Sequence, residues 1–344
     1  MKTVKVGNLT LGDKKEIYVQ SMLSTARDDI EGAVNQAIAL EKAGCKIIRL
    51  AIPDAQSVKT VYKLKENVSV PIVADIHFDY KLALECVSAG IDKIRINPGN
   101  IGADEKVKAV ADACKNAGIP IRIGVNGGSL EKSILAKYGA ATSDALVESA
   151  LYHASLLEKF DFDDIVISIK SSDVKTMISG YRKLSQVCNY PLHLGVTEAG
   201  TKNMGIIKNA IGIGSLLADG IGDTIRVSLT SDPVNEVYAG YDILTALGLV
   251  KNRVTFVSCP TCGRCQIDLI SLAEKIENEL KNCNKPIKVA VMGCAVNGPG
   301  EARDADIGIA GGKDEGLIFK KGQILRKVPY DNLFIEFMKE IEKI

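Results

Sequence analysis

Four cysteines are spaced so that they could bind one metal centre. Cys259, Cys262 and Cys265 form the run CPTCGRC, and Cys294 follows in MGCAVNGPGE. Thiolates separated by two residues around a turn converge on one centre, and such ligands are typical of zinc and iron–sulfur sites. A zinc ribbon normally has two CxxC pairs, and the second pair is missing around Cys294. The other five of the nine cysteines are scattered singly, which is typical of small buried residues.

The turn after Cys294 offers a ligand of another kind. Residues 297–301, NGPGE, predict a tight turn that directs Glu301 back toward Cys294. A carboxylate oxygen among thiolates would be the weak and replaceable ligand, which suggests a cluster that binds substrate as well as passing electrons. Spacing alone leaves both Cys265 and Glu301 open as the fourth ligand.

Polar side chains also recur where predicted strands end, and (β/α)8 barrels hold their reacting groups at these ends. Four arginines and one lysine stand there: Arg49, Arg95, Arg122, Arg226 and Lys170. Asp75 and Glu198 are the carboxylates in the same positions, and two carboxylates cannot neutralise five cations. Guanidinium and ammonium groups suit phosphate oxygens. This mouth is therefore predicted to bind a phosphorylated or diphosphorylated small molecule.

Other residues at these strand ends are candidates for acid–base work. Glu198 lies in an exposed turn, GVTEAG, and His77 directly follows Asp75-Ile. His77 is equally consistent with a hydrogen-bonded structural histidine, and His193 lies earlier in its strand and is expected to be structural. The loop 126–139 after Asn126 is either a lid or a decoration of the barrel.

The elements that must position these residues follow a regular order. Strand-like and helical segments alternate through the first two-thirds of the chain, which predicts a parallel sheet. Eight such units in roughly 245 residues match a (β/α)8 TIM barrel, with a doubly wound open sheet as the alternative. The candidate strands are 16–22, 45–52, 71–77, 92–97, 120–126, 164–170, 191–197 and 223–229.

The pattern changes after residue 250. A strand, the first cysteine turn, a helix, a second strand, the second cysteine loop, a third strand, a hairpin and a terminal helix predict a small α+β module. We therefore expect a substrate-binding barrel over residues 1–250 and a metal-binding domain over residues 251–344. A metal centre could also stabilise so small a module.

The composition excludes several classes of protein. A hydrophobic fraction of 46% is normal for a soluble globular chain, and a formal net charge of +1 gives no argument for a nucleic-acid or membrane surface. We expect no signal peptide and no apolar run that could cross a bilayer. Nine cysteines without a regular framework argue against a secreted disulfide scaffold. A cytoplasmic protein with reduced thiols is expected.

At this point the motifs resemble those of one enzyme family. SCPTCGR (258–264) and MGCAVNGPGEARDADIGIAGG (292–312) closely resemble the 4-hydroxy-3-methylbut-2-enyl diphosphate synthases of the non-mevalonate (MEP) isoprenoid pathway. Matching barrel motifs are VQSM (19–22), ADIHFDY (74–80), KIRINPGNIG (93–102), RIGVNGGSLE (122–131), HLGVTEAG (193–200) and GIGDTIRVSLTSDP (220–233). The resemblance runs from about residue 3 to the C-terminus, with both halves in order.

The resemblance implies a TIM barrel joined to a small [4Fe–4S] domain, in the bacterial two-domain form. The implied reaction is a two-electron reduction that opens the ring of 2-C-methyl-D-erythritol 2,4-cyclodiphosphate and loses water, with flavodoxin or ferredoxin as the electron donor. The implied cluster ligands are Cys259, Cys262, Cys294 and Glu301. Arg49, Arg95, Arg122 and Lys170 would hold the diphosphate, and Asp75, His77, Asn126 and Glu198 would surround the carbon skeleton.

The family also implies a head-to-tail homodimer in which one subunit's cluster faces its neighbour's barrel. The family does not require a cysteine at the position of Cys265, so we expect Cys265 to be a bystander and Glu301 to be the ligand.

Two other interpretations of the sequence remain. One is a TIM-barrel lyase or pterin-type synthase with a structural zinc, and the other is a non-enzymatic redox sensor.

Overall fold

The computed structural model describes residues 2–281, 283–295 and 297–344. Asn282, at the end of a predicted helix, and Val296, in the second cysteine loop, lie outside this description. The chain separates into two compact units, Met1–Leu249 and Val250–Ile344. We call them the barrel unit and the cysteine unit, and each is described by itself.

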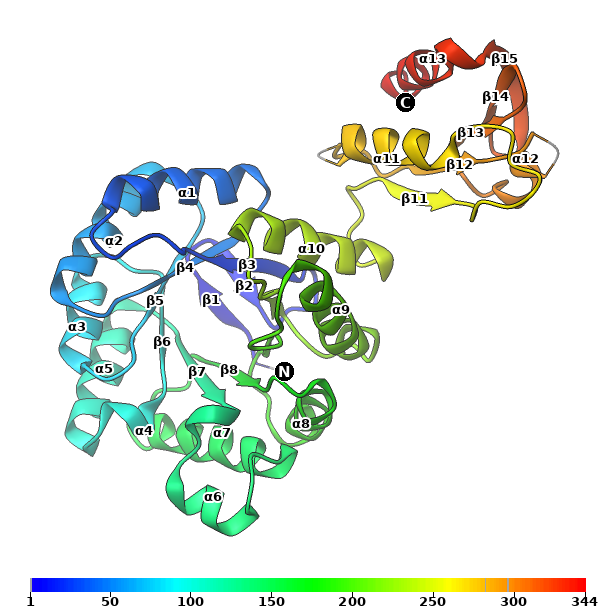
Figure 1. Ribbon diagram of the computed structural model, residues 1–344. Coiled ribbons are helices and arrows are strands. Elements are labelled where there is room, and N and C mark those ends of the chain that lie inside the picture. Colours follow the sequence, from blue (N-terminus) through cyan, green and yellow to red (C-terminus); the bar gives the residue numbers. More distant parts are fainter. Residues whose placement is uncertain (1, 282, 296) are drawn as a thin grey trace. The chain divides into compact units, whose positions relative to one another are not determined.

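Eight parallel strands form the centre of the barrel unit (Figure 1). They are β3 (Tyr18–Met22), β4 (Ile47–Ala51), β5 (Ile72–Asp75), β6 (Lys93–Ile96), β7 (Ile121–Asn126), β8 (Ile165–Lys170), β9 (His193–Leu194) and β10 (Thr224–Ile225). Their order is β8-β7-β6-β5-β4-β3-β10-β9. A parallel bridge between Ile167 and Leu192 joins the two ends, so the sheet closes into the predicted TIM barrel.

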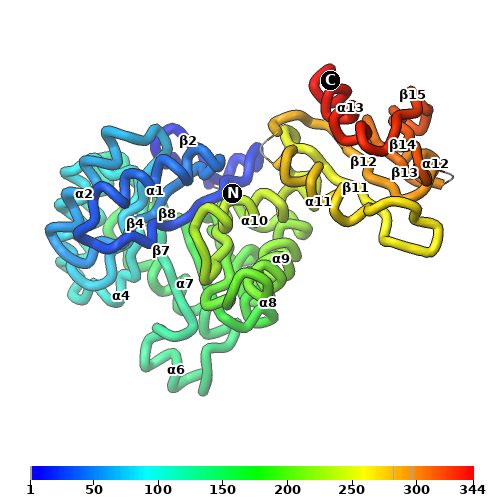
Figure 2. Tube along the Cα trace, turned by 45° about the horizontal axis from the view of Figure 1, so that its top comes forward, coloured from blue at the N-terminus to red at the C-terminus, as the bar shows by residue number. Residues whose placement is uncertain are grey.

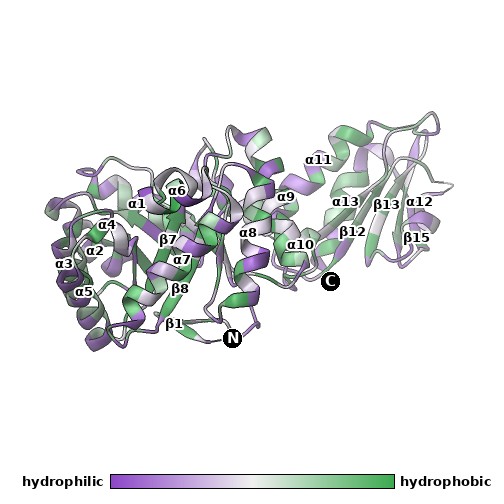
Figure 3. Ribbon diagram, turned by 90° about the horizontal axis from the view of Figure 1, so that it is seen from below, coloured by the Kyte–Doolittle hydropathy of each residue, from purple (hydrophilic) through white to green (hydrophobic). Residues whose placement is uncertain are grey.

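Helices follow the strands and form the outer ring. They are α1 (Ile30–Lys42), α2 (Ala55–Asn67), α3 (Tyr80–Ser88), α5 (Asp104–Ala117), α7 (Ser143–Glu158), α8 (Val174–Val187), α9 (Lys202–Ala218) and α10 (Pro233–Ala246). Figure 3 shows β7 and β8 in apolar colour and the outer helices α3 and α5 as largely hydrophilic. Apolar strands and largely hydrophilic outer helices are expected, because each helix buries only one apolar face against the sheet.

Aspartates begin five of these helices and thereby shape the loops at the barrel mouth. Asp29, Asp54, Asp79, Asp173 and Asp232 each accept a hydrogen bond from a backbone N–H in the first turn of the helix that follows. Such caps satisfy N–H groups that have no partner within the helix. The chain therefore changes from strand to helix within three to seven residues, which helps to keep the strand-end side chains in place.

Shorter elements decorate the loops after β6 and β7. They are α4 (Pro98–Ile101), the 3₁₀ turn η1 (Gly127–Ser129) and α6 (Lys132–Tyr138). The predicted loop 126–139 is thus mostly η1 and α6. Both Figure 1 and Figure 2 place α6 on the outside of the barrel beside α7. In this structure α6 therefore packs on the barrel wall as a decoration.

A hairpin that the sequence pattern did not reveal closes the base of the barrel. Strands β1 (Val4–Val6) and β2 (Leu9–Leu11) pair antiparallel. Val4, Val6 and Leu11 are buried against side chains near the starts of the barrel strands, including Ile47 and Val73. The N-terminal end of the barrel is therefore filled by apolar packing.

The cysteine unit is a five-stranded sheet with two helices on one face. Its strands are β11 (Thr255–Ser258), β12 (Lys288–Met292), β13 (Ile307–Gly311), β14 (Glu315–Lys320) and β15 (Gln323–Pro329), paired in sequence order. The first three are parallel and the last two form a hairpin. Helices α11 (Leu269–Leu280) and α13 (Tyr330–Glu342) share one apolar core with the sheet. The predicted order of elements is confirmed.

The opposite face of this sheet is lined by smaller residues and carries the second cysteine loop. Ala290, Ala302, Ala305 and Ala310 are buried there with Phe319. The short helix α12 (Gly298–Glu301) lies over this face and contacts β13. Small side chains let the loop backbone lie close to the sheet.

In the part of the chain that the structure describes, no helix is long and apolar enough to cross a bilayer.

Helix α13 offers a matched test of this packing. Phe337 is fully buried and Ile335 is 54% exposed. Phe337→Ala should lower the free energy of unfolding of the cysteine unit by about 3–5 kcal/mol, because it removes buried apolar area and leaves a cavity. Urea unfolding followed by circular dichroism measures this change. Ile335→Ala should shift it by less than about 0.5 kcal/mol, and equal effects of the two variants would contradict the packing.

Candidate active site and metal centre

A pocket of about 230 Å³ lies at the carboxyl ends of the barrel strands. It contains seven of the residues predicted from the sequence for catalysis or substrate binding, which come from five strands and the loop after β5. Its lining consists of Met22, Arg49, Asp75, His77, Arg95, Arg122, Asn126, Ser168, Lys170, Thr197, Arg226 and Ser228. Alternate residues of a strand point to the same side, so Arg122 and Asn126 both face inward from β7.

Asp75 is the anionic centre of this pocket. Its Oδ1 accepts a hydrogen bond from Nη1 of Arg95 at 3.0 Å, and its Oδ2 lies 3.5 Å from both Nη2 of Arg49 and Nε2 of His77. Burial alone would raise the pKa of Asp75, but Arg49, the His77 hydrogen bond and Arg95 together hold it well below its ordinary value. Asp75 is therefore a carboxylate that fixes two arginines, and it is poorly suited to donate a proton.

Arg226 has a carboxylate partner that the sequence did not suggest. Its Nη2 donates to Oε1 of Glu236 at 3.1 Å, and Oε2 of Glu236 accepts from the hydroxyl of Ser21 at 2.9 Å. Glu236 is buried on α10, behind the barrel strands. Arg226 is thus largely neutralised from outside the barrel.

Two cations of the pocket are left without such a partner. All three guanidinium nitrogens of Arg122 are buried and have no hydrogen-bond partner among the described residues. Burial lowers the pKa of Lys170, and the neighbouring Arg122 and Arg49 lower it further. Buried polar groups are nearly always hydrogen-bonded, so the unpartnered guanidinium of Arg122, with Lys170 beside it in the pocket lining, could bind an anion.

Glu198 and His193, two other residues considered from the sequence, do not line this pocket. Glu198 is exposed, does not line the pocket, and follows Thr197, which does. Its φ of 53° is left-handed, a strained conformation for glutamate of the kind that clusters at functional sites. His193 is fully buried, and its Nδ1 lies 2.8 Å from the hydroxyl of Thr224.

A buried lysine was missed by the sequence analysis. Lys93 begins β6, two residues before Arg95, and its side chain is fully buried. The alternation of a strand could have found it, because residues two apart share a face. Lys93 was not predicted as a site residue because it lies at the start of its strand, whereas the site was expected at the strand ends.

Glu131 and His153 pair behind the mouth and connect two of its loops. Glu131 ends the motif RIGVNGGSLE, and its Oε1 contacts Nε2 of His153, which is buried on α7. A Cβ on Gly99, in the loop after β6, would lie only 2.6 Å from Cε1 of His153. The pair therefore positions the loops that follow Arg95 and Arg122.

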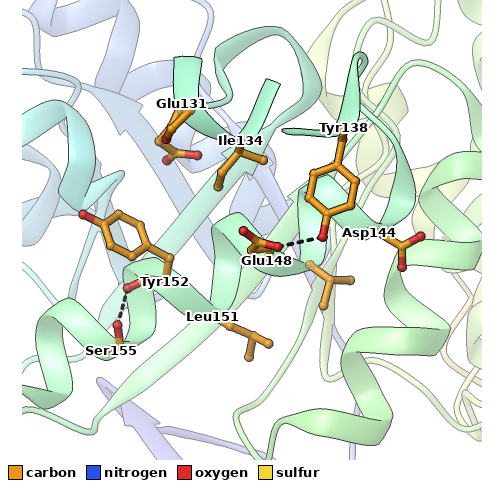
Figure 4. A pocket seen from close by; sticks show the side chains of 10 residues that line it. Glu131, Ile134, Tyr138, Asp144, Glu148, Leu151, Tyr152 and Ser155 are labelled. Atoms are coloured by element: carbon orange, nitrogen blue, oxygen red, sulfur yellow. Dashed lines mark hydrogen bonds between the residues drawn. The ribbon is translucent and has the colours of Figure 1, made fainter. Parts of the chain in front are cut away.

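A larger hollow of about 670 Å³ lies outside the barrel between α6 and α7 (Figure 4). Its charged lining residues, Glu131, Asp144 and Glu148, are acidic. Glu148 accepts from Tyr138 and Lys137, and Asp144 accepts from Lys183. With no free cation in its lining, this hollow does not suit an anion and is not the candidate active site.

The two cysteine loops lie next to each other in the cysteine unit. The first follows β11 and the second follows β12, and the carboxyl ends of neighbouring parallel strands meet at one edge. The N–H of Gly293 donates to Sγ of Cys259 at 3.2 Å. A Cβ on Gly293 would lie 2.7 Å from Sγ of Cys265, so only glycine allows this approach beside Cys294.

The chemistry of these donors suits a soft metal centre. The backbone N–H of Arg264 lowers the pKa of the Cys262 thiol, and its guanidinium lowers it further. A lower pKa favours the thiolate, which is the form that binds metal. Cys259, Cys265 and Cys294 are partly buried, whereas Cys262 and Glu301 are exposed. Across the described residues, no three His, Cys, Asp or Glu side chains lie close enough to hold one ion.

Two family models match the chain in order. The GcpE TIM-barrel domain matches residues 1–241, and the GcpE protein C-terminal domain matches residues 255–343. A Clostridium perfringens protein is 59% identical over 343 residues, which cover 100% of this chain and 98% of the relative. One from Ruminiclostridium cellulolyticum is 56% identical, with 100% and 97% covered. Both relatives are named 4-hydroxy-3-methylbut-2-en-1-yl diphosphate synthase (flavodoxin).

Two of the solved structures that resemble this chain cover about seven-tenths of it. Dihydropteroate synthase from Stenotrophomonas maltophilia matches with a TM-score of 0.54 at 14% identity, covering 72% of this chain and 97% of that one. Type I 3-dehydroquinate dehydratase from Clostridium difficile matches with a TM-score of 0.52 at 12% identity, covering 70% and 98%. At such low identity these similarities show the fold alone.

Replacing Asp75 tests the charge arrangement of the mouth. Asp75→Asn should lower the free energy of unfolding of the barrel unit by about 3 kcal/mol at neutral pH, because it leaves buried arginines without their carboxylate. The folded protein holds the pKa of Asp75 below its ordinary value. The stabilisation is therefore complete above a pH of about 4 and is lost as the pH falls below it.

Urea unfolding of the Asp75→Asn variant at several pH values, followed by circular dichroism, measures this difference. The difference from wild type should stay constant between about pH 7 and pH 5 and shrink toward pH 3. The exposed Asp164 gives a matched control, Asp164→Asn, with little effect. A difference that is the same at every pH would contradict the arrangement.

Proposed function

The chain belongs to the GcpE family, and from this premise we propose that it converts 2-C-methyl-D-erythritol 2,4-cyclodiphosphate to 4-hydroxy-3-methylbut-2-enyl diphosphate. Two electrons and two protons enter, one ring C–O bond opens, and one water leaves. Family membership extends over both units, whereas the structural similarity to pterin synthases and a dehydratase covers only the barrel. A reductive enzyme of isoprenoid biosynthesis is therefore favoured over a zinc-containing lyase or pterin-type synthase.

The observation that carries the substrate class is the unpaired charge in the barrel mouth. Arg122, whose guanidinium has no hydrogen-bond partner among the described residues, would bind the diphosphate directly together with Lys170, which lines the same pocket. Arg49 and Arg95 would bind it in orientations that Asp75 fixes. Asn126, whose loop is held by the Glu131–His153 pair, would contact the carbon skeleton.

The protons would come from residues at the rim. His77 is about half exposed, and its Nε2 is oriented toward Asp75. Glu198 stands in a strained turn beside the pocket, and strain of this kind supports a functional position. We assign Glu198 as the proton donor to the departing oxygen and His77 as a hydrogen-bonding group beside it.

We propose a [4Fe–4S] cluster held by Cys259, Cys262, Cys294 and Glu301. When bound, this cluster would supply the electrons one at a time. The N–H of Gly293 donates to Sγ of Cys259, which would be a cluster ligand. Hydrogen bonds to such sulfurs help to set the reduction potential of a cluster. Cys265 instead donates its S–H to the carbonyl of Ile267 at 3.3 Å. A thiol used in this way supports Glu301 as the fourth ligand.

The remaining parts of the proposal follow from the family. The relatives are named for flavodoxin, and flavodoxin or ferredoxin would deliver the electrons to this chain in the cytoplasm. A homodimer would let the cluster of one subunit serve the barrel of its neighbour.

The ligand assignment is tested by metal analysis of protein purified without oxygen. About four iron and about four sulfide per chain, with broad absorption near 400 nm, are expected. Cys259→Ala, Cys262→Ala and Cys294→Ala should lose the cluster, whereas Cys265→Ser and the control Cys283→Ser should retain it. One zinc without sulfide would rule out the redox chemistry. Loss in Cys265→Ser with an unaffected Glu301→Gln would reassign the fourth ligand.

Mixing two inactive variants tests the shared active site. Lys170→Met disables the barrel and Cys259→Ala disables the cluster, so each alone should be inactive. If active sites form between subunits, exchange should pair an intact barrel with an intact cluster and restore partial turnover. Turnover is measured with a chemical reductant. No recovery after exchange, shown by mass spectrometry of the mixed dimer, would contradict the arrangement.

A further inference from the structure

Lys93 is a buried cation that no part of the proposed mechanism uses. It pairs with Val73 of β5 in the barrel register, and its side chain is 0% exposed. Its Nζ has no hydrogen-bond partner among the described residues. An unpaired ammonium in a protein interior is costly, and apolar residues are common at such barrel positions. A lysine here therefore calls for a ligand.

The surroundings of Lys93 lack negative charge. The charged side chains that act on it are Arg122 and Arg49, and both lower its pKa beyond the effect of burial. Gln20 and His193 are buried in the barrel interior as well, with both amide atoms of Gln20 and Nε2 of His193 unpartnered. Arg122 and Lys93 alone offer eight N–H donors. This donor excess matches an acceptor-rich anion better than water.

The position of Lys93 links it to the mouth. It stands two residues before Arg95 on the inward face of β6, and Arg95 is paired in register with Arg122 of β7. Successive inward positions on a strand are roughly 7 Å apart, about the length of an extended lysine side chain. The ammonium can therefore approach the same space as the unpartnered guanidinium of Arg122.

We propose that Lys93 is a further diphosphate-binding residue that forms, with Arg122, the floor of the anion site. The assignment rests on the proposed substrate class. The diphosphate supplies the partners that these cations lack, so the free protein carries an instability that binding removes. Residues kept for binding often cost stability in this way. Lys93 should thus weaken the free barrel and strengthen its complex.

Lys93→Met, which keeps the length of the side chain and removes its charge, tests the proposal in the full chain with inorganic diphosphate as the probe. Titration calorimetry should show a Kd at least tenfold weaker than wild type. Without ligand, the Tm should rise by at least about 2 °C, because a buried unpaired charge is gone. Lys59→Met, at an exposed lysine of α2, should change neither quantity. Neither readout depends on the metal centre or on turnover.

The other outcomes are equally definite. An unchanged Kd in Lys93→Met, beside a wild type that binds diphosphate, would overturn the role of Lys93 and leave the proposed function standing. A lower Tm would mark Lys93 as structural and overturn the proposal as well. A wild type that does not bind diphosphate would overturn the anion site itself, and with it both inferences. If Lys93→Met does not fold, Lys93→Gln gives the same comparison.

Discussion

Gathering positive charge inside a protein is costly without negative charge nearby, and this constraint organises the barrel. Asp75 holds Arg49 and Arg95, and Glu236 holds Arg226 from the helix outside. These pairs let three arginines stand in fixed orientations at the strand ends. Among the described residues the guanidinium of Arg122 has no hydrogen-bond partner, and the charges acting on Lys170 are mainly those of arginines. An anion would supply the partners that are missing, so the mouth as a whole supports the proposed substrate class better than any single side chain does.

The two units apply one architectural rule to different chemistry. In each, the functional side chains follow the carboxyl ends of parallel strands, where loops from neighbouring strands meet. The barrel brings cations together in this way, and the cysteine unit brings Cys259 next to the segment that holds Cys294. Close approach needs a missing side chain in both places: Gly99 makes room for the ring of His153, and Gly293 makes room for Sγ of Cys265. The glycines in the motifs are thus as necessary as the reactive residues.

Much of this could be predicted from the sequence, because the barrel has a strong periodic signal. All eight barrel strands and the order of elements in the cysteine unit were expected, and strand-end positions located the pocket. The predictions missed features that depend on contacts between distant residues. Glu236 lies ten positions after Arg226 on a helix that gives no hint of its partner, and His153 finds Glu131 across a loop. The hairpin β1–β2 was missed because each strand has only three residues.

The apolar hairpin at the base also determines how molecules pass through the barrel. With Val4, Val6 and Leu11 packed beneath the strands, the described residues fill the base of the barrel, and the charged pocket lies at the opposite, carboxyl ends of the strands. Substrate and product must use the same entrance, so one cannot arrive until the other has left. Both would carry a diphosphate, which under the proposed assignment the same cations would hold. Product should then behave as a competitive inhibitor, and its departure past those cations becomes a natural slow step of the cycle.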